Sequence, residues 1–171
     1  MNVKLSFPVV TTTTAAIRES SSHDEVAEIL QRAHDYAQSH QLEFNGSLSP
    51  QDAWYLVQHC QAVLVDVRTS EERKFVGYVK DSVHIAWATG TSFNRNPRFL
   101  KELEHRVGKD QTIILLCRSG QRSTLAAQAA AAVGFKRIYH VLEGFEGELN
   151  TSLQRNHVQG WKVHHLPWQQ D

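Results

Sequence analysis

The sequence predicts an α/β protein in which a parallel sheet is covered by helices on both faces. Two runs of branched apolar residues, 63–67 and 112–116, are typical of strands that are buried on both sides. Segments with the apolar spacing of helices separate these runs from each other and from a third strand at 137–142. Because strands that alternate with helices form parallel sheets, we expect ligands to bind at the carboxyl ends of the strands.

The composition limits the kind of protein this is. A chain of 171 residues with 41% hydrophobic residues is long enough for one domain with extensions. Lysine plus arginine equals aspartate plus glutamate at 18 each, so no overall field attracts nucleic acid or an anionic membrane. Two cysteines are too few for a disulfide framework, and the N-terminus is a poor secretory signal. We expect a cytoplasmic protein with no nucleic-acid partner and no membrane span.

The first 48 residues are predicted to form an N-terminal extension. Residues 1–21 show no helical period, which leaves an edge strand and a flexible arm as alternatives. An amphipathic helix is predicted over 22–39, because Ser22 begins a capping box ahead of a regular apolar face. A polar linker, 40–48, then leads to the domain.

The domain is predicted to span 49–171 and to begin with a helix. Ser49 is a suitable N-cap, Pro50 fits the first helical position, and Asp52 adds negative charge to the first turn. Cys60 falls on the apolar face of this helix. We therefore interpret Cys60 as a packing residue and not as a reactive thiol.

Further helices and strands follow in alternation. Thr69 and Glu72 form a capping box, which predicts a short helix that ends at Gly77. The remaining elements are expected in this order: a strand at 83–86, a loop at 87–97, a helix at 98–107, the strand at 112–116, a helix at 123–133 and the strand at 137–142. Residues 117–122 are therefore the connection between a buried strand and a helix.

This connection carries the residues that indicate chemistry. A loop between a strand and a helix directs backbone N–H groups into one space, and the helix adds the positive end of its dipole. Arg118 and Arg122 strengthen that field, which favours a thiolate. We interpret Cys117 as a nucleophile. The alternative, an inert thiol at the end of a strand, does not account for the two arginines.

Asp66 and Arg68 are expected at the same edge of the sheet as Cys117. A carboxylate in that position usually pairs with an arginine or accepts hydrogen bonds from a loop, so both residues are expected to support the loop. Zinc needs three or four convergent ligands, and the ten histidines show no suitable spacing. We expect neither a metal nor an organic cofactor.

Three motifs resemble those of the rhodanese family of sulfurtransferases, and of its single-domain bacterial members in particular. They are the segment 65–72 with its Asp-x-Arg signature, the loop 117–123, and the closing residues 142–145 with 160–161 and 166–168. The resemblance covers about 49–168 and implies a rhodanese-like three-layer fold. Phe145 stands where the family usually has glycine, and the segments 87–97 and 146–159 are longer than in a minimal domain.

The resemblance also implies an activity. Such proteins transfer a sulfane sulfur from thiosulfate, polysulfide or a persulfide to a thiol, to cyanide or to a protein acceptor. Cys117 would carry the sulfur as a persulfide. The small anionic donor would be bound by the rest of the loop, which comprises Arg118, Ser119, Gly120, Gln121, Arg122 and Ser123.

Two alternatives stay open at this point. A persulfide carrier or docking module for a protein partner needs the same thiolate as an enzyme. Cysteine-dependent phosphatases and arsenate reductases also bind anions in such a loop, but five residues separate their cysteine and arginine, whereas four separate Cys117 from Arg122. The sequence favours a sulfurtransferase over a carrier, and a carrier over a phosphatase.

Overall fold

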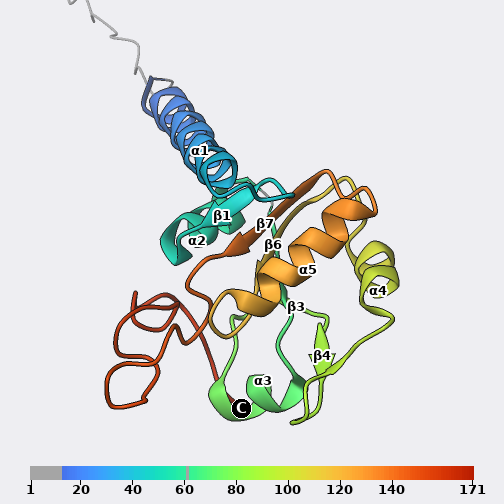
Figure 1. The fold of residues 1–171 in the computed structure, drawn as a ribbon. Helices are drawn as coiled ribbons and strands as arrows, with labels where there is room; N and C mark the ends of the chain where they lie inside the picture. Colours follow the sequence, from blue (N-terminus) through green and yellow to red (C-terminus); the bar gives the residue numbers. More distant parts are fainter. Residues whose placement is uncertain (1–12, 61) are drawn as a thin grey trace, which may run out of the picture.

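A five-stranded sheet in the order β1-β7-β6-β2-β3 organises the computed structural model, which describes residues 13–60 and 62–171. Each neighbouring pair in this sheet is parallel, as the sequence predicts. The strands are β1 (Gly46–Leu48), β2 (Val63–Asp66), β3 (Val83–His84), β6 (Thr112–Leu116) and β7 (Arg137–Val141). Figure 1 shows them with the helices that surround them.

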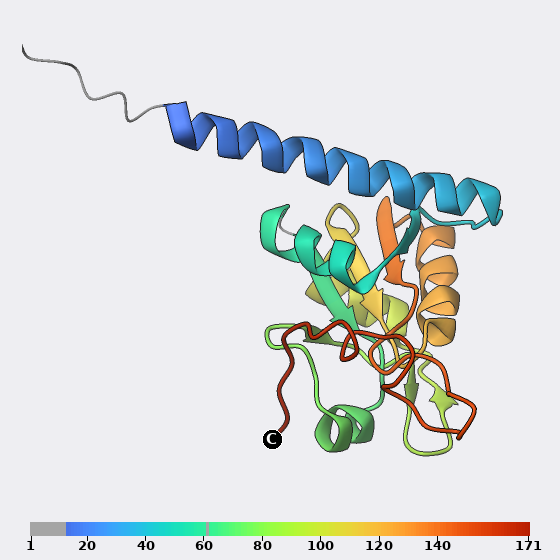
Figure 2. The same cartoon turned by 90° about the vertical axis from the view of Figure 1, so that its left-hand side faces the viewer.

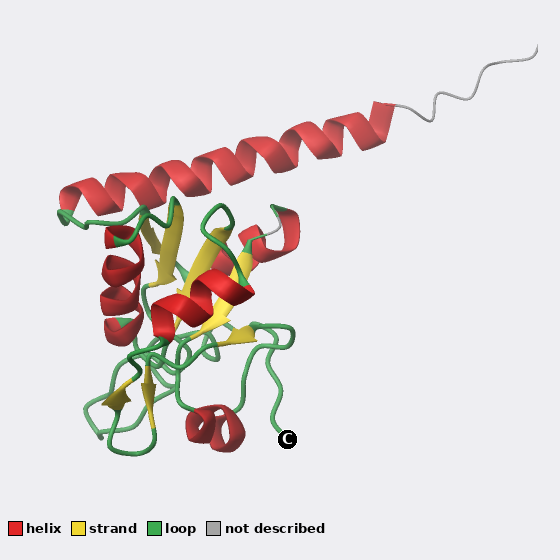
Figure 3. Cartoon of the chain, turned by 90° about the vertical axis from the view of Figure 1, so that its right-hand side faces the viewer, coloured by secondary structure: helices red, strands yellow, loops and turns green. Residues whose placement is uncertain are grey.

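Helices cover both faces of this sheet, which confirms the predicted layers. On one face lie α1 (Thr13–Ser39) and α2 (Pro50–His59), and on the other lie α4 (Phe99–Arg106) and α5 (Gln121–Ala132). A short helix, α3 (Ser70–Val76), lies at the end of the domain opposite α1 (Figure 3).

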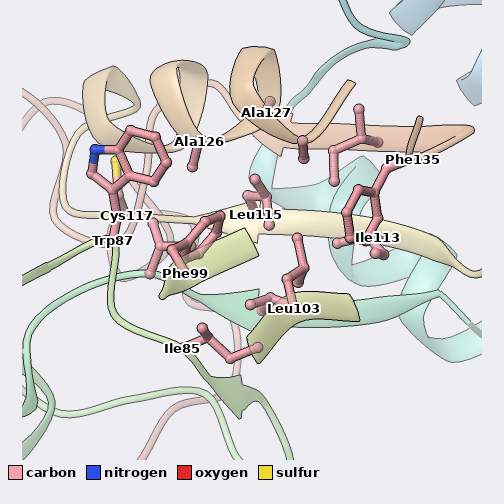
Figure 4. Packing of buried hydrophobic residues seen from close by; sticks show 14 of the residues in the cluster. Ile85, Trp87, Phe99, Leu103, Ile113, Leu115, Cys117, Ala126, Ala127 and Phe135 are labelled. Atoms are coloured by element: carbon pink, nitrogen blue, oxygen red, sulfur yellow. The ribbon is translucent and has the colours of Figure 1, made fainter. Parts of the chain in front are cut away.

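Strand β6 shows how the sheet separates two cores. Ile113 and Leu115 pack with α4 and α5, whereas Ile114 and Leu116 pack with α1 and α2. Side chains alternate between the faces of a strand, so Cys117 continues the row of Ile113 and Leu115. Figure 4 shows Cys117 at one end of that core, together with Trp87 and Ala126. The first residue after the strand therefore faces α5.

Helix α1 is longer than predicted. It begins at Thr13, so Ser22 lies within the helix and the predicted capping box does not start it. No proline or glycine occurs between Pro8 and Gly46, and the residues before Ser22 have adequate helix propensity, so nothing in the sequence stops the helix there. The expectation for residues 1–12 lies outside the described residues. Figure 2 shows the N-terminal part of α1 extending past the rest of the domain.

Strand β1 occupies the end of the segment that was predicted as a polar linker. It pairs with β7, and Ser47 stands opposite His140 in the register. A Cβ atom at Gly46 would lie 2.3 Å from the carbonyl oxygen of Ala33, so glycine is what allows α1 to lie directly against this strand. The expectation of a polar linker was wrong here, whereas the division of the chain at residue 48 stays a prediction.

The two helix caps predicted in the domain, Ser49 and Thr69, are confirmed. The Ser49 side chain accepts a hydrogen bond from the Asp52 backbone at 3.1 Å and caps α2. Thr69 and Glu72 form both hydrogen bonds of a capping box at the start of α3. The segment 87–97, predicted as a loop, contains a small hairpin made of β4 (Ala88–Thr89) and β5 (Asn94–Arg95).

The chain after β7 packs back onto the domain. Trp161 is fully buried, meets the ring of Trp54 edge to face at 5.8 Å, and donates its indole N–H to the Pro167 carbonyl at 2.9 Å. Tyr78 and Gln169 exchange backbone hydrogen bonds further along. Within residues 13–60 and 62–171, no helix combines the length and apolar character needed to cross a bilayer.

Replacing Trp161 by alanine is expected to lower the free energy of unfolding by about 3–5 kcal/mol, because it leaves a cavity in the core that joins this segment to α2. Chemical denaturation measures the change. Val158→Ala, in the same segment but 60% exposed, is the control and should stay within about 0.5 kcal/mol of wild type. A Trp161→Ala variant as stable as wild type would show that the C-terminal segment is not part of the core.

Candidate active site

Cys117 lies directly after β6 and at the N-terminus of α5. Its sulfur accepts the backbone N–H of Gly120 at 3.1 Å and lies 3.3 Å from the hydroxyl of Ser123. The Cys117 side chain is only 1% exposed. An N–H donor, a hydroxyl and the positive end of a helix dipole meet at one sulfur atom, and together they stabilise negative charge on it.

The turn at Gly120 requires a glycine. Its φ is +90°, and a Cβ atom there would lie 2.1 Å from the carbonyl oxygen of Leu142. A side chain at this position would therefore displace either the loop or the strand end beside it, and the N–H that points at the sulfur would move with it.

The segment after β7 holds the beginning of the loop. The backbone N–H groups of Phe145 and Glu146 donate to the carbonyl oxygens of Cys117 and Arg118 at 2.8 and 2.9 Å. Gly144 has φ +70°, and a Cβ atom there would lie 2.5 Å from the backbone of Arg118. The two segments are thus in contact without room for a side chain between them.

Arg122 forms a two-pronged ion pair with Glu72 of α3, with N–O distances of 2.7 and 2.6 Å. The same carboxylate accepts the Thr69 backbone N–H at 3.0 Å, so one side chain joins the start of α3 to the loop. Burial alone raises the pKa of Glu72, but the hydrogen bonds from Arg122 and Thr69 outweigh burial and hold that pKa below its usual value. The sequence identified Glu72 as a helix cap and missed its contact with the loop.

The hairpin between β4 and β5 covers the arginines of the loop. The ring of Phe93 lies 4.9 Å from the guanidinium carbon of Arg122 and 6.0 Å from that of Arg118. Both distances are within the range of cation–π contacts. Ser119 is half-buried and Gln121 is exposed at the first turn of α5. An aromatic side chain from the long 87–97 segment therefore lies at the loop.

Asp66 and Arg68 form an ion pair in which neither side chain is exposed. Two side-chain hydrogen bonds of 3.0 and 2.7 Å join them, and the Arg68 backbone N–H donates to Asp66 at 3.0 Å. Arg73 also donates to Asp66, at 2.8 Å. Burial alone raises the pKa of Asp66, but the two arginines outweigh burial and hold that pKa below its usual value. Asp66 is therefore charged around neutral pH.

Arg68 reaches the loop through Phe145. Its guanidinium lies 4.0 Å above the Phe145 ring and donates to the Gly77 carbonyl at 2.8 Å. The Phe145 backbone in turn holds the Cys117 carbonyl. The phenyl ring, which stands where the family usually has glycine, is fully buried beneath the arginine.

A buried histidine behind Cys117 was not anticipated. His140 of β7 has its Nδ1 atom 3.2 Å from the Ser123 hydroxyl and its Nε2 atom 2.7 Å from the Ser47 hydroxyl. Ser123, predicted to bind substrate, is itself fully buried between this ring and the sulfur. The sequence signal was one histidine among the otherwise hydrophobic residues 138–142.

The other cysteine has a different setting. Cys60 packs beside the core formed with α1 and α2, and burial raises its pKa, although a hydrogen bond from the Ala62 backbone opposes the effect. A thiol in this setting is a poor nucleophile. Among the described residues, no group of three or more histidine, cysteine, aspartate or glutamate side chains is placed to hold a metal ion.

A parallel sheet with a cysteine loop at the start of a helix defines the class of this protein as a rhodanese-like α/β domain. The family model of the Rhodanese-like domain matches residues 49–150. Because this match covers more than half of the chain, the protein belongs to the rhodanese-like family. The fold prediction is thereby confirmed.

Individual relatives agree with this assignment. The chain is 38% identical over 117 residues to RP600, an uncharacterized protein of Rickettsia prowazekii, covering 67% of this chain and 88% of the relative. It is 31% identical over 100 residues to the thiosulfate sulfurtransferase GlpE of Actinobacillus pleuropneumoniae, covering 58% and 82%. Its structure is similar to that of Rv0390 from M. tuberculosis, with 39% identity, a TM-score of 0.66, and coverage of 73% and 97%.

Replacing Asp66 by asparagine is expected to lower the free energy of unfolding by about 3–5 kcal/mol, since it leaves the buried charge of Arg68 without its partner. The matched control is Asp110→Asn, which removes an exposed carboxylate paired with Lys136 and should leave stability nearly unchanged. Denaturant titrations at neutral pH compare the two. Equal, small effects would show that the buried pair does not stabilise the fold.

The same pair predicts the acid dependence of stability. The pKa of Asp66 is lower in the folded protein than in the unfolded chain, so its contribution is complete above the ordinary carboxyl value of about 3.9. That contribution is lost as the pH falls from there through the folded pKa. We expect a shallower acid limb in Asp66→Asn than in wild type when the free energy of unfolding is measured against pH. An unchanged limb would contradict this assignment.

Proposed function

We propose that this protein is a sulfurtransferase that moves a sulfane sulfur from thiosulfate or a persulfide donor to a thiophilic acceptor through a Cys117 persulfide. The observation that carries the proposal is the Cys117 sulfur at the N-terminus of α5, with the Gly120 N–H at 3.1 Å. The kinship with GlpE, which is named a thiosulfate sulfurtransferase, supports the same chemistry.

In the first step, the Cys117 thiolate attacks the outer sulfur of thiosulfate. The new S–S bond forms as the bond between the two thiosulfate sulfurs breaks, and sulfite leaves with that electron pair. The products are a cysteine persulfide anion and sulfite, so the total charge of −3 is conserved. The loop N–H groups and the dipole of α5 stabilise the charge as it moves between sulfur atoms.

In the second step, an acceptor takes the outer sulfur. A thiolate or cyanide attacks that sulfur, the S–S bond to Cys117 breaks, and the cysteine thiolate returns. Attack by cyanide gives thiocyanate and attack by a thiolate gives a new persulfide, so neither reaction needs an oxidant. A covalent intermediate of this kind gives ping-pong kinetics.

Arginines draw the anionic donor to the loop. Arg118, Ser119 and Arg122 are partly buried and Gln121 is exposed, and of these we assign Arg118, Ser119 and Gln121 to contact with the donor. The charge of Arg122 is partly balanced by Glu72, so we assign Arg122 to holding the shape and field of the loop. We assign Asp66 and Arg68 to support of the loop through Phe145.

A persulfide carrier for one protein partner is the second candidate, because the same thiolate serves it. The buried position of Cys117, at 1% exposure, favours a small donor over direct contact with a large partner surface. Turnover with small acceptors separates the two. Hydrolysis of an aryl phosphate that depends on Cys117 would instead support the phosphatase alternative.

Thiosulfate is expected to add one sulfur atom to Cys117, and cyanide to remove it as thiocyanate. Intact-mass spectrometry of the reduced protein before and after each reagent measures both steps. Cys117→Ala should abolish the mass gain, and the matched variant Cys60→Ala should keep it. If wild type gains no sulfur from thiosulfate or polysulfide, the enzyme proposal is wrong.

Replacing Glu72 by glutamine is expected to lower kcat/KM for thiosulfate by roughly 10- to 100-fold, because it loosens Arg122 and shifts the loop. The amide keeps an oxygen for the Thr69 N–H, so α3 is expected to remain. Glu71→Gln, its exposed neighbour, is the matched control and should keep the wild-type value. Equal kcat/KM in both variants would show that the Glu72 contact does not serve catalysis.

A further inference from the structure

We propose that His140 is a positioning residue for Cys117 and acts through the hydroxyl of Ser123. The inference rests on the proposed function only in that sulfur transfer needs Cys117 as a thiolate. It assigns a task to a histidine that touches neither the donor nor the acceptor.

A continuous row of buried polar atoms leads from β1 to the nucleophile. The Ser47 hydroxyl lies 2.7 Å from Nε2 of His140, Nδ1 lies 3.2 Å from the Ser123 hydroxyl, and that hydroxyl lies 3.3 Å from the Cys117 sulfur. The exposed fractions of these four residues range from 0% to 8%.

The register of the sheet explains why these residues meet. Ser47 pairs with His140, and His140 pairs with Leu115, so the three stand in one row across β1, β7 and β6. Residues in one row share a face of the sheet, and Cys117 follows two residues after Leu115 on that face. The imidazole is therefore directed to the layer in which α5 lies.

The surroundings of the ring determine which nitrogen carries the proton. Nδ1 lies 3.2 Å from the Ser123 hydroxyl and 3.5 Å from the Thr124 hydroxyl, and both hydroxyls donate to the Gly120 carbonyl at 2.9 Å. With the protons of both hydroxyls directed to that carbonyl, the two hydroxyl oxygens act as acceptors toward the ring, so Nδ1 is the protonated nitrogen. Nε2 then accepts the proton of the Ser47 hydroxyl.

With Nδ1 as the donor to the Ser123 oxygen, the Ser123 proton can be donated either to the Gly120 carbonyl or to the Cys117 sulfur, depending on the charge of the sulfur. The Ser123 hydroxyl has the Gly120 carbonyl at 2.9 Å and the sulfur at 3.3 Å as alternative acceptors. An anionic sulfur is the stronger acceptor because hydrogen bonds to charged groups are stronger than neutral ones. With Nδ1–H donating to the Ser123 oxygen, the dipoles of the N–H and O–H groups align toward the thiolate and reinforce each other.

His140 is neutral when it donates to the Ser123 oxygen. Burial lowers the pKa of His140 to about 4, against the opposing hydrogen bond to Gly120. Its ring is faced by the hydroxyls of Ser47, Ser123 and Thr124, by the backbone of Gly120, and by the ring of Phe44, which lies nearly perpendicular to it. The titratable group that these contacts reach is Cys117, through Ser123. His140 therefore orients a donor and does not add a charge.

Ser47 connects this row to the part of the chain before the family match, which begins at residue 49. A short strand outside the matched segment thus supplies the last member of the row. The segment before residue 49 therefore contributes a hydrogen bond to the site, in addition to packing against the sheet.

The pH dependence of Cys117 alkylation by iodoacetamide tests the proposal, in a Cys60→Ala background that leaves one thiol. His140→Phe removes the donor and keeps a ring, and its alkylation midpoint is expected to rise by about one pH unit, which slows alkylation about tenfold at neutral pH. His140→Asn places an amide N–H near the position of Nδ1 and is expected to restore most of the wild-type rate.

Neighbouring hydroxyls provide the controls. Ser123→Ala is expected to shift the midpoint upward like His140→Phe, and the double variant to shift it by less than the sum, because both act through one hydroxyl. Thr124→Val removes a hydroxyl that faces the ring but not the sulfur, and should leave the midpoint in place. Circular dichroism verifies the fold of each variant.

Three results would overturn the proposal: a folded His140→Phe variant with the wild-type midpoint, an asparagine variant that behaves as the phenylalanine variant does, or a Thr124→Val shift as large as that of Ser123→Ala. If His140→Phe does not fold, Ser123→Ala and His140→Asn decide the matter. Alkylation involves no sulfur donor. A wild-type protein that takes no sulfur would thus refute the proposed function without touching the role of His140.

Discussion

Two opposite charges are buried at the carboxyl edge of the sheet, and the loop around Cys117 depends on them. Asp66 pairs with the Arg68 guanidinium, whose central carbon lies 4.0 Å from the centre of the Phe145 ring. The Phe145 backbone holds the Cys117 carbonyl at 2.8 Å. A guanidinium is strongly destabilising in an apolar interior without a counter-ion, so the Asp66 carboxylate is what allows Arg68 to be buried against Phe145. The position of Cys117 thus depends on an ion pair that has no exposed surface.

The charges around the loop are unequal in a way that suits an anionic donor. Asp66 and Glu72 balance arginines from the strand end, from α3 and from the loop, and each carboxylate is itself held by hydrogen bonds. Arg118 is left with an aromatic neighbour, Phe93, and no carboxylate is part of that contact. Two carboxylates therefore offset most of the positive charge of the three arginines that support the structure, whereas Arg118, at the position proposed to meet the donor, has no carboxylate in its contact with Phe93.

Local patterns in the sequence predicted local structure well, and tertiary constraints explain the exceptions. The helix starts at Ser49 and Thr69 depend on residues within one turn, and both are present. Strand β1 has three residues and no pattern of its own, since its place is set by β7 on one side and by the close approach of α1 on the other. The start of α1 was misplaced because a capping box also occurs inside helices that continue through it.

The contrast between local patterns and tertiary contacts also explains which parts of the site could be predicted. The loop 117–123 is contiguous, so its residues could be named from the sequence, whereas Glu72, Phe93 and His140 reach it from three other elements. Of these three, His140 is the one whose importance could have been predicted from the sequence by a general rule. A polar residue on the apolar face of a buried strand must find partners, because an unpaired buried polar group costs about 1–3 kcal/mol. Parallel pairing in register gave it Ser47 on one side, and α5 gave it Ser123 on the other. Only the Ser123 hydroxyl then lies between the His140 ring and the Cys117 sulfur. Because the buried ring needs a hydrogen-bond partner, it also orients this hydroxyl.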